Sequence, residues 1–305
     1  MSKAKAVLAF TRWIFVEPVI FGYMRFSYLG RSDARLARST DDLEKRKQAL
    51  YAPERMEERF HFFEKLCAPS LRWQSDQDFR FAIFASPELP EPYKEQLHAI
   101  TADIPQVEIV YDDAAHITYA IDPWIARQPA VHTTRTLHFR LDDDDAMSSD
   151  FIATLRENME RVPDRGIITR PTGLFLMDTA DGPELLAKFE PFIAIGFALV
   201  NPAGCIHNPY ALRHANHHRS TPALMLPDNF AYIHAAHLQS DTLAAQRAKL
   251  ANARQEHTRY YGNRPRRFRL AVKRQFGGHH PEHFLKIIET SPARRRQSEV
   301  STPAK

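Results

Sequence analysis

The chain has 305 residues, of which 44% are hydrophobic and 26% charged, values that are ordinary for a soluble globular protein. Its two cysteines, Cys67 and Cys205, exclude a disulfide framework and a cysteine-rich zinc site, and they fit a reducing cytoplasm. The formal net charge of +4 is unevenly spread, because residues 262–305 hold eleven lysines and arginines against three acidic residues, a net +8 that leaves −4 for the rest. We therefore predict a mildly acidic body followed by a basic tail.

The N-terminal stretch, residues 4–23, is apolar but is interrupted by Arg12, Glu17 and Pro18. It is too interrupted for a membrane-spanning helix, and no long apolar core leads to a cleavage site, so an export signal is not predicted either. We expect residues 1–17 to form a helical extension that packs against the body. The alternative is a helix that lies on a membrane surface.

Apolar segments and helical patterns alternate through the first half of the chain. Strands are predicted at 19–24, 79–84, 107–111 and 137–141, and helices at 41–66 (capped by Asp41), 92–100, 114–127 and 148–156. Strands that alternate with helices imply a mostly parallel sheet with right-handed crossovers. Residues 18–161 are therefore predicted to form a Rossmann-like nucleotide-binding half, although no GxGxxG or P-loop motif occurs.

The pattern changes after residue 161. Neighbouring strands are predicted at 166–170 and 174–177, and a further strand at 194–200. We expect residues 162–261 to form a mixed-sheet half that completes a single α/β domain. The tail, residues 262–305, would then be a helical appendage.

Four consecutive carboxylates, Asp142 to Asp145, form an acidic run after the strand predicted at 137–141. In an extended chain Asp142 and Asp144 would face one way, and Asp143 and Asp145 the other. Two such charges ~4 Å apart repel by roughly 4 kcal/mol at an effective dielectric of 20, and a hard divalent cation is the usual compensation. Mg²⁺ is typically held by one or two carboxylates plus substrate phosphates, so a nucleoside diphosphate is the expected co-ligand. The alternative is a solvated acidic loop that caps the next helix.

Ligands of open α/β sheets bind beyond the carboxyl ends of the strands, which draws attention to two further residues. Arg25 and Tyr28 follow the first strand, where a guanidinium could pair with a diphosphate and an aromatic ring could stack on a base. The alternative for Arg25 is an ion pair with a local carboxylate. Arg140, which directly precedes the acidic run, could serve only to neutralise it.

Several segments occur in a fixed order along the chain, namely Arg25–Tyr28, Leu50–Arg55, Arg59–Phe60 with Phe63–Glu64, Pro69–Leu71, Gln74–Phe79, Leu89–Pro90 and Phe139–Ala146. Together they resemble the bacterial "putative rhamnosyl transferase" family over residues 19–245. The acidic run itself is similar to the DXD motif of GT-A glycosyltransferases. The resemblance implies a GT-A-like fold, with a nucleotide-sugar half at 18–161 and an acceptor half at 162–261.

The resemblance also implies roles for single residues. Asp142 would lie near the ribose or base of a nucleotide sugar, and Asp144 and Asp145 would reach a Mn²⁺ or Mg²⁺ ion directly or through water. An inverting transferase needs a carboxylate base for the acceptor hydroxyl, and Asp178 and Asp228 are the candidates.

Many GT-A enzymes supply one late histidine as a metal ligand, and the resemblance makes His234 and His237 the candidates here. The family tends to have Gly-His-Asn at this place, whereas this chain has Ala-His-Leu at 236–238. The alternative for each histidine is a structural or surface role. His217 and His218 could instead contact acceptor hydroxyls.

The leading hypothesis is a metal-dependent transferase that moves a sugar, with rhamnose as one candidate, from a nucleoside diphosphate sugar to a glycan or lipid-linked acceptor. A second hypothesis is a non-catalytic carbohydrate- or polyanion-binding protein with a degenerate site. A third, a metal-dependent phosphohydrolase, would need HxD or HxH ligands, which the first half lacks. Nucleic acid is not an expected partner, because the body is acidic and no known binding module occurs.

The basic tail contains an apolar stripe, in which Phe268, Val272 and Phe276 repeat every four positions. Such a helix could lie in a membrane interface, where each basic residue adds roughly 1 kcal/mol near anionic lipid. The protein would then be cytoplasmic but peripheral at the inner face of the membrane, which suits a lipid-linked or envelope acceptor. The alternative is a terminal helix packed on the catalytic domain.

Overall fold

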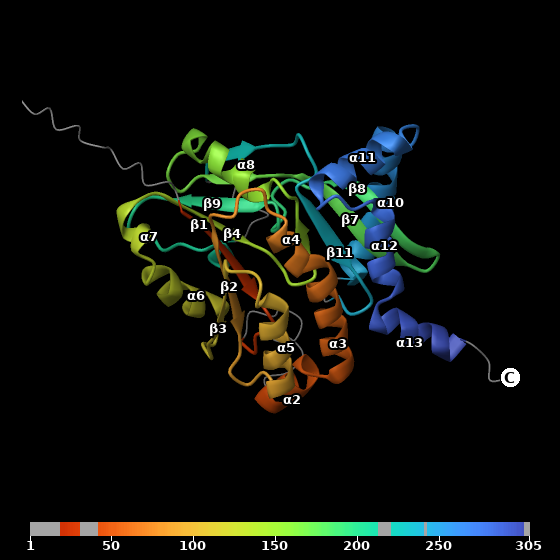
Figure 1. The fold of residues 1–305 in the computed structure, drawn as a ribbon, viewed down its shortest axis with the longest axis horizontal. Helices are drawn as coiled ribbons and strands as arrows, with labels where there is room; N and C mark the ends of the chain where they lie inside the picture. Colours follow the sequence, from red (N-terminus) through yellow and green to blue (C-terminus); the bar gives the residue numbers. More distant parts are fainter. Residues whose placement is uncertain (1–18, 31–41, 213–220, 241–242, 302–305) are drawn as a thin grey trace, which may run out of the picture.

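The computed structural model describes residues 19–30, 42–212, 221–240 and 243–301 (Figure 1). The extension predicted over residues 1–17 lies outside the described residues, and so do His217 and His218. Within them, two β-sheets stand next to each other and helices cover both.

The larger sheet has seven strands in the order β10-β6-β9-β4-β1-β2-β3. β9 runs antiparallel to both of its neighbours, and every other pair is parallel. The predicted α/β fold with a mostly parallel sheet is thereby confirmed. The strands are β1 (Val19–Arg25), β2 (Arg80–Ala85), β3 (Val107–Tyr111), β4 (Thr136–Arg140), β6 (Ile167–Thr169), β9 (Phe197–Asn201) and β10 (Ala223–Met225).

The order in which strands are added to this sheet reverses at β1. β1, β2 and β3 follow one another on one side, and β4 then lies on the other side of β1. β1 needs a glycine at its centre, because a Cβ at Gly22 would lie 2.3 Å from Phe81 and 2.4 Å from Phe139. Open α/β sheets bind ligands at such a reversal, beyond the carboxyl ends of the strands. The topology therefore indicates a site beyond Arg25 and Arg140.

The smaller sheet has the strand order β5-β11-β7-β8. The prediction that segments 166–170 and 174–177 are neighbours is wrong, because β6 belongs to the larger sheet and β7 to the smaller one. β6, β9 and β10 follow residue 161 in the sequence but belong to the larger sheet. The boundary between the two sheets therefore does not coincide with residue 161. The strands are β5 (Ala146–Met147), β7 (Thr172–Thr179), β8 (Gly182–Phe189) and β11 (Tyr232–Ala236).

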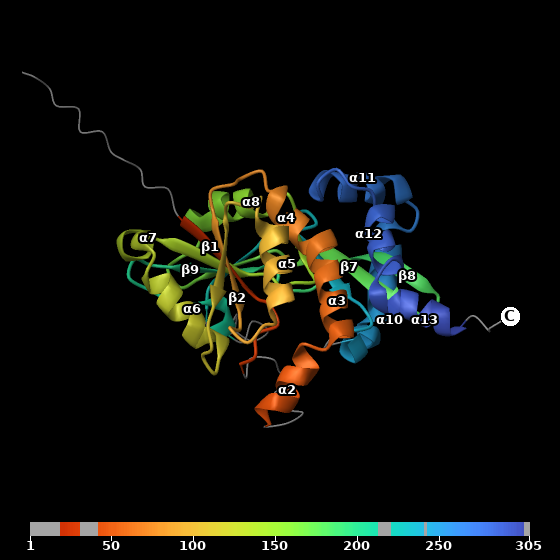
Figure 2. The ribbon, with the colours of Figure 1, turned by 60° about the horizontal axis from the view of Figure 1, so that its bottom comes forward.

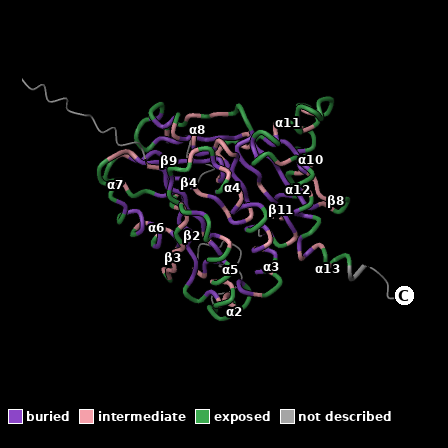
Figure 3. The backbone as a smooth tube through the Cα atoms, viewed as in Figure 1, coloured by how far each residue is buried: buried purple, intermediate pink, exposed green. Residues whose placement is uncertain are grey.

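Helices cover both faces of the larger sheet (Figure 2). α3, α5 and α8 pack on one face through Met56, Leu97 and Phe151, and α6 and α7 pack on the other through Trp124 and Val131. The inner strands between these layers are mostly buried, whereas the edge strands β3 and β10 are partly exposed (Figure 3). The helices are α2 (Leu43–Leu50), α3 (Pro53–Phe62), α4 (Ala68–Arg72), α5 (Glu91–Thr101), α6 (Ile117–Ala126), α7 (Pro129–Thr133) and α8 (Phe151–Asn158).

The single helix predicted over residues 41–66 is wrong, because the segment is divided into α2 and α3. Pro53 begins α3, in the first helical turn where proline is favoured and its missing N–H costs no helical bond. Asp42 caps α2, and the predicted cap, Asp41, lies outside the described residues. α3 continues into a π-helical turn at Phe63–Cys67, a feature that is frequent at functional sites.

The tail packs on the smaller sheet. Phe268, Val272 and Phe276 are at most 8% exposed and share a core with Leu174 of β7 and Phe284. The prediction that this stripe inserts into a membrane is therefore wrong, and the alternative of a packed terminal helix is confirmed. No helix among the described residues is long and apolar enough to cross a membrane. The helices after β11 are α10 (Leu243–Tyr261), α11 (Pro265–Gln275), α12 (Pro281–Glu289) and α13 (Pro292–Ser301).

Candidate active site

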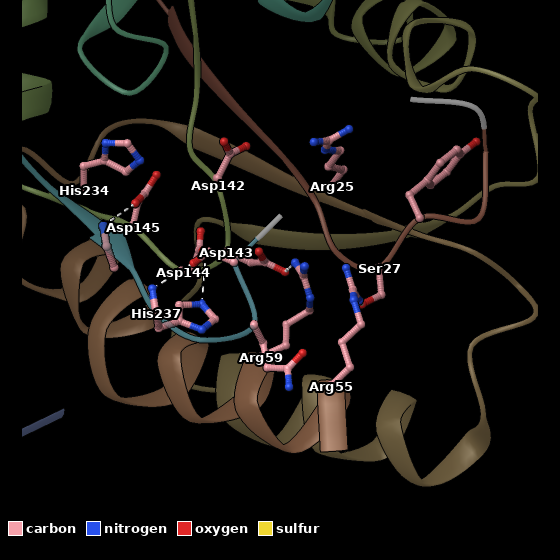
Figure 4. Close-up of a pocket in the computed structure, with 14 residues that line it drawn as sticks. Arg25, Ser27, Arg55, Arg59, Asp142, Asp143, Asp144, Asp145, His234 and His237 are labelled. Carbon is pink, nitrogen blue, oxygen red and sulfur yellow. Dashed lines mark hydrogen bonds and ion pairs between the residues drawn. The ribbon is translucent and has the colours of Figure 1, made fainter. Parts of the chain in front are cut away.

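A pocket lies at the reversal point of the larger sheet (Figure 4). β1 and β4 are adjacent parallel strands, with Tyr23 paired to Arg140, so the residues that follow the two strands meet at one edge. The acidic run then leads into β5, which pairs with β11 and so brings the end of β11 to the same edge. The pocket is lined by Arg25, Ser27, Tyr28, Arg55, Arg59, Asp142, Asp143, Asp144, Asp145, His234, Ala235, His237, Gln239 and Ser240.

Every carboxylate of the acidic run has a partner within the chain. Asp142 pairs with the guanidinium of Arg140, and Asp143 with that of Arg59. Asp144 contacts the imidazole of His237, and Asp145 accepts from the backbone amide of Ala235. These partners offset part of the repulsion predicted from the sequence, although burial and the neighbouring carboxylates still raise the pKa of Asp143 and of Asp145. The side chains of Asp142 and Asp144 are 33% and 25% exposed, whereas Asp143 and Asp145 are buried. The extended conformation expected for the run is wrong, because the run is a turn in which the amide of Asp145 donates to the carbonyl of Asp142 at 3.2 Å. All four carboxylates line the pocket, and the first and third are the more exposed.

These partners set the charge that the run presents. Burial opposes the ionisation of Asp144, but its hydrogen bond with His237 holds its pKa at about 2. Burial also opposes the ionisation of Asp142, and the charge of Arg140 lowers that pKa. Burial, followed by the charges of Asp144 and Asp142, raises the pKa of Asp145. The pocket therefore presents anionic oxygens chiefly from Asp142 and Asp144.

His237 lies between two carboxylates. Its Nε2 is 3.3 Å from Oδ2 of Asp144, and its Nδ1 is 3.4 Å from Oε1 of Glu58. The ring stacks on Phe62 at a centroid distance of 4.0 Å, and the amide of His237 donates to Oγ of Ser240 at 2.9 Å. Burial lowers the pKa of His237, but the two carboxylates outweigh burial and raise it.

His234 is less suited than His237 to bind a cation. Nζ of Lys188 lies 3.1 Å from its Nδ1, and a lysine ammonium can only donate, so Nδ1 accepts. Burial, followed by the charge of Lys188, lowers the pKa of His234 to about 4. The ring is therefore neutral at pH 7, and its single lone pair is already engaged. Of the two predicted histidines, the geometry favours His237.

The donor set of the pocket fits a hard divalent cation. Carboxylate oxygens and an imidazole nitrogen are suitable ligands for Mn²⁺ or Mg²⁺, and Asp144 and His237 offer one of each. Among the described residues, no group of three or more His, Cys, Asp or Glu side chains is arranged to hold a metal ion. Mg²⁺ commonly takes only one or two protein ligands and fills its other positions with water and substrate phosphate. Asp144 and His237 therefore fit a site that a bound diphosphate would complete.

Cationic side chains face the carboxylates across the pocket (Figure 4). Arg25 comes from the end of β1, and Arg55 and Arg59 come from α3. Arg55 donates to Oγ of Ser27 at 3.4 Å, and Ser27 has a φ of 44°, which is uncommon for a residue other than glycine. Sequence reasoning missed Arg55, Arg59 and Ser27. The available signal was the four-residue spacing of the two arginines, which places them on one face of a helix.

Of the residues predicted for the site, Tyr28 is buried at the edge of the pocket, and Asp178 and Asp228 do not line it. Tyr28 lines the pocket but is only 3% exposed, and its hydroxyl donates to Asp112 at 3.1 Å. Asp178 is buried in an ion pair with Arg294, and Asp228 is exposed and lines a different pocket. The role of Asp178 or Asp228 as the base stays a prediction, and the lining of the acidic pocket does not support it.

Three solved structures are similar to the chain at low TM-scores. The mannosyltransferase PcManGT from Pyrobaculum calidifontis, in complex with GDP-Man and Mn²⁺, is 10% identical with a TM-score of 0.39, over 95% of this chain and 77% of that chain. Mouse xyloside xylosyltransferase 1 is 11% identical with a TM-score of 0.33, over 69% and 85%. TarS of S. aureus is 10% identical with a TM-score of 0.35, over 83% and 46%. No curated protein matches the sequence.

A family match covers most of the chain. The model of the family described as "Putative rhamnosyl transferase" matches residues 19–249. This span contains every residue that lines the acidic pocket. The resemblance expected from the sequence is thereby confirmed. The chain belongs to this rhamnosyl transferase family and is a glycosyltransferase.

Proposed function

We propose that the enzyme uses Mn²⁺ or Mg²⁺ to transfer a sugar from a nucleoside diphosphate sugar to a hydroxyl of a glycan or lipid-linked acceptor. One observation carries the proposal: the pair of Asp144 and His237 shares a pocket with the guanidiniums of Arg25 and Arg55. This pocket lies where the strand order reverses, which is the usual place for a nucleotide in an open α/β sheet.

The two walls of the pocket suit different parts of such a donor. Asp144 and His237 would hold the cation, which when bound supplies neutralisation of the leaving diphosphate. The guanidiniums of Arg25 and Arg55 suit phosphate oxygens, which they can bind through paired N–H groups. Asp142 offers acceptor oxygens for a ribose hydroxyl or a base N–H.

The proposal for the acceptor and the location comes from the surface of the tail. Arg266, Arg267, Lys273 and Arg274 are exposed on α11, while the apolar side of that helix is buried. These cations can attract an anionic acceptor, or the anionic inner face of the membrane, by charge alone. A cytoplasmic enzyme with peripheral, salt-sensitive membrane contact is therefore part of the proposal.

Turnover of nucleotide sugars tests the proposed function. Full-length protein with Mn²⁺ or Mg²⁺ is expected to hydrolyse, or transfer from, at least one member of a panel of UDP- and dTDP-linked sugars that includes the rhamnosyl donor. Chelation of the metal with EDTA is expected to abolish this turnover. If no nucleotide sugar in a broad panel binds more tightly than millimolar, the hypothesis of a degenerate, non-catalytic site takes its place.

A further inference from the structure

Glu58 is a fully buried carboxylate on α3 that lies behind the pocket rather than in its lining. One of its oxygens, Oε2, accepts a hydrogen bond from the backbone amide of Ala293 at 2.8 Å. The other, Oε1, is 3.4 Å from Nδ1 of His237. Neither Oε1 nor this Nδ1 has a conventional hydrogen-bond partner among the described residues. Burial opposes the ionisation of Glu58, but its contacts with His237, Ala293 and Ser291 outweigh burial and lower its pKa. A buried carboxylate therefore stands directly behind the ring of His237.

The position of Glu58 determines which nitrogen of His237 can bind a cation. A neutral imidazole has one N–H donor and one lone pair. Both ring nitrogens face a carboxylate here, and the hydrogen bond to Asp144 places a hydrogen on Nε2 when no cation is bound. A cation beside Asp144 would take the place of that hydrogen, and Glu58 favours keeping the other one on Nδ1, which leaves the lone pair of Nε2 for the cation. Nε2 is the nitrogen that lies 3.3 Å from Asp144. Phe62 stacks on the ring and fixes its plane.

We propose that Glu58 is a positioning residue, which holds His237 with the lone pair of Nε2 directed at the cation position beside Asp144. The inference rests on the proposed function, because it takes His237 as a metal ligand. Carboxylate–histidine–metal arrangements of this kind fix the tautomer and the orientation of the ring. Glu58 would contribute to metal affinity without touching the metal or the substrate.

The support for His237 extends into the tail through α13. Ala293, which donates to Glu58, stands in the first turn of this helix. Two more contacts fix the helix, an ion pair between Arg294 and Asp178 and one between Arg296 and Glu57 at 2.7 Å. The family match ends at residue 249, so the Glu58 support uses a segment that lies outside it.

Binding of Mn²⁺ alone to the full chain, followed by electron paramagnetic resonance, tests the role of Glu58. Glu58→Gln keeps the shape of the side chain, and its oxygen can still accept from Ala293. Its amide NH₂ then faces Nδ1, which must accept, so the hydrogen moves to Nε2 and removes the lone pair that a cation needs. We expect Mn²⁺ affinity to fall about 10- to 100-fold, as for other partners of metal-binding histidines. Glu57→Gln is the matched control, because Glu57 is an exposed neighbour on the same helix that contacts α13 but not His237.

Nitrogen-15 NMR of the metal-free protein gives a readout that is independent of binding. The wild-type ring of His237 is expected to carry a hydrogen on Nδ1 in addition to the one on Nε2 that contacts Asp144, whereas the Glu58→Gln ring carries a hydrogen on Nε2 alone. A thermal unfolding midpoint close to wild type shows that the variant is folded.

The controls separate this inference from the proposed function. Loss of Mn²⁺ binding in Asp144→Ala, with wild-type affinity in Glu58→Gln, overturns the role of Glu58 and leaves the metal site standing. Wild-type Mn²⁺ affinity in His237→Ala also overturns the role of Glu58, because His237 would then not be a metal ligand. Unchanged Mn²⁺ binding in Asp144→Ala removes the proposed metal site itself.

Discussion

Asp143 is one of the two buried carboxylates of the acidic run, and the ion pair with Arg59 compensates its charge. The side chain of Asp143 is 4% exposed and that of Arg59 is 18% exposed. Removing one member of a buried ion pair leaves an uncompensated charge in a medium of low dielectric constant. Here the neighbouring carboxylates add to the penalty, because burial and then the charge of Asp144 raise the pKa of Asp143 against the effect of Arg59.

Arg59→Ala is therefore expected to lower the free energy of unfolding by about 3 kcal/mol, measured by urea denaturation. The double variant Arg59→Ala/Asp143→Asn is expected to recover at least half of that loss, because the uncompensated charge is gone. If the two substitutions destabilise the protein additively, the ion pair has no special role in holding the turn.

His138 is expected to make the fold sensitive to acid. It is fully buried on β4, where it contacts the hydroxyl of Tyr23 at 2.6 Å, and burial lowers its pKa to about 3. The unfolded chain takes up this proton below its ordinary pKa of 6.5, whereas the native state does not. The contribution of neutral His138 is therefore complete above pH 6.5 and is lost as the pH falls toward 3.

Between pH 7 and pH 5 this group should remove about 2 kcal/mol from the free energy of unfolding. His138→Asn, which carries no titrating ring, should show a shallower fall over the same range in urea denaturation at each pH. Parallel profiles for the two proteins would mean that His138 is not the residue responsible.

At the scale of elements, α3 carries both the arginines that line the pocket and the residues that contact His237, the proposed metal ligand. Arg55, Glu58, Arg59 and Phe62 follow the spacing i, i+3, i+4 and i+7, which places them on one face of the helix. Arg55 and Arg59 line the pocket, while Glu58 and Phe62 hold His237. One helix therefore fixes the distance between the proposed phosphate-binding and metal-binding groups.

α11 provides a test of how the tail is used. Val272 is fully buried against the smaller sheet, whereas Leu270, two residues earlier, is 58% exposed. Val272→Ala is expected to cost about 2 kcal/mol in urea denaturation through lost burial and the cavity that it leaves. Leu270→Ala should change stability by no more than about 0.5 kcal/mol. Equal effects of the two substitutions would show that the apolar side of α11 does not pack as described.

At the scale of the whole molecule, residues that follow strands of both sheets line the pocket, and the tail packs against the smaller sheet. The acidic run leaves the larger sheet, and His237 follows the last strand of the smaller one. Some basic residues of the tail form ion pairs within the chain. Arg294 pairs with Asp178 and Arg296 with Glu57, both outside the tail, and Arg269 pairs with Glu282 within it. The tail is thus part of the folded body and not a separate appendage.

The sequence predicts local features of this molecule better than distant contacts. The strands β1, β2, β3 and β4 and the acidic run were readable because buried strands are continuous apolar segments and adjacent carboxylates are conspicuous. The partners of the run could not be predicted, because Arg59, Ala235 and His237 reach it only through the packing of α3 and the pairing of β11 with β5. Glu58 gave no signal, since a glutamate in a helix is normally exposed.

The most direct test of the account is a calorimetric titration with nucleoside diphosphates, with and without Mn²⁺, on wild-type protein and on Asp144→Ala. We expect the wild type to bind at least one nucleoside diphosphate about tenfold or more tightly with Mn²⁺ than without it, because the cation links the phosphates to the carboxylate. Asp144→Ala should lose this Mn²⁺-dependent gain while remaining folded, as shown by a cooperative thermal unfolding transition. Affinity that is indifferent to Mn²⁺, or a gain that persists in Asp144→Ala, would contradict the assignment of the pocket as a metal-dependent nucleotide-sugar site.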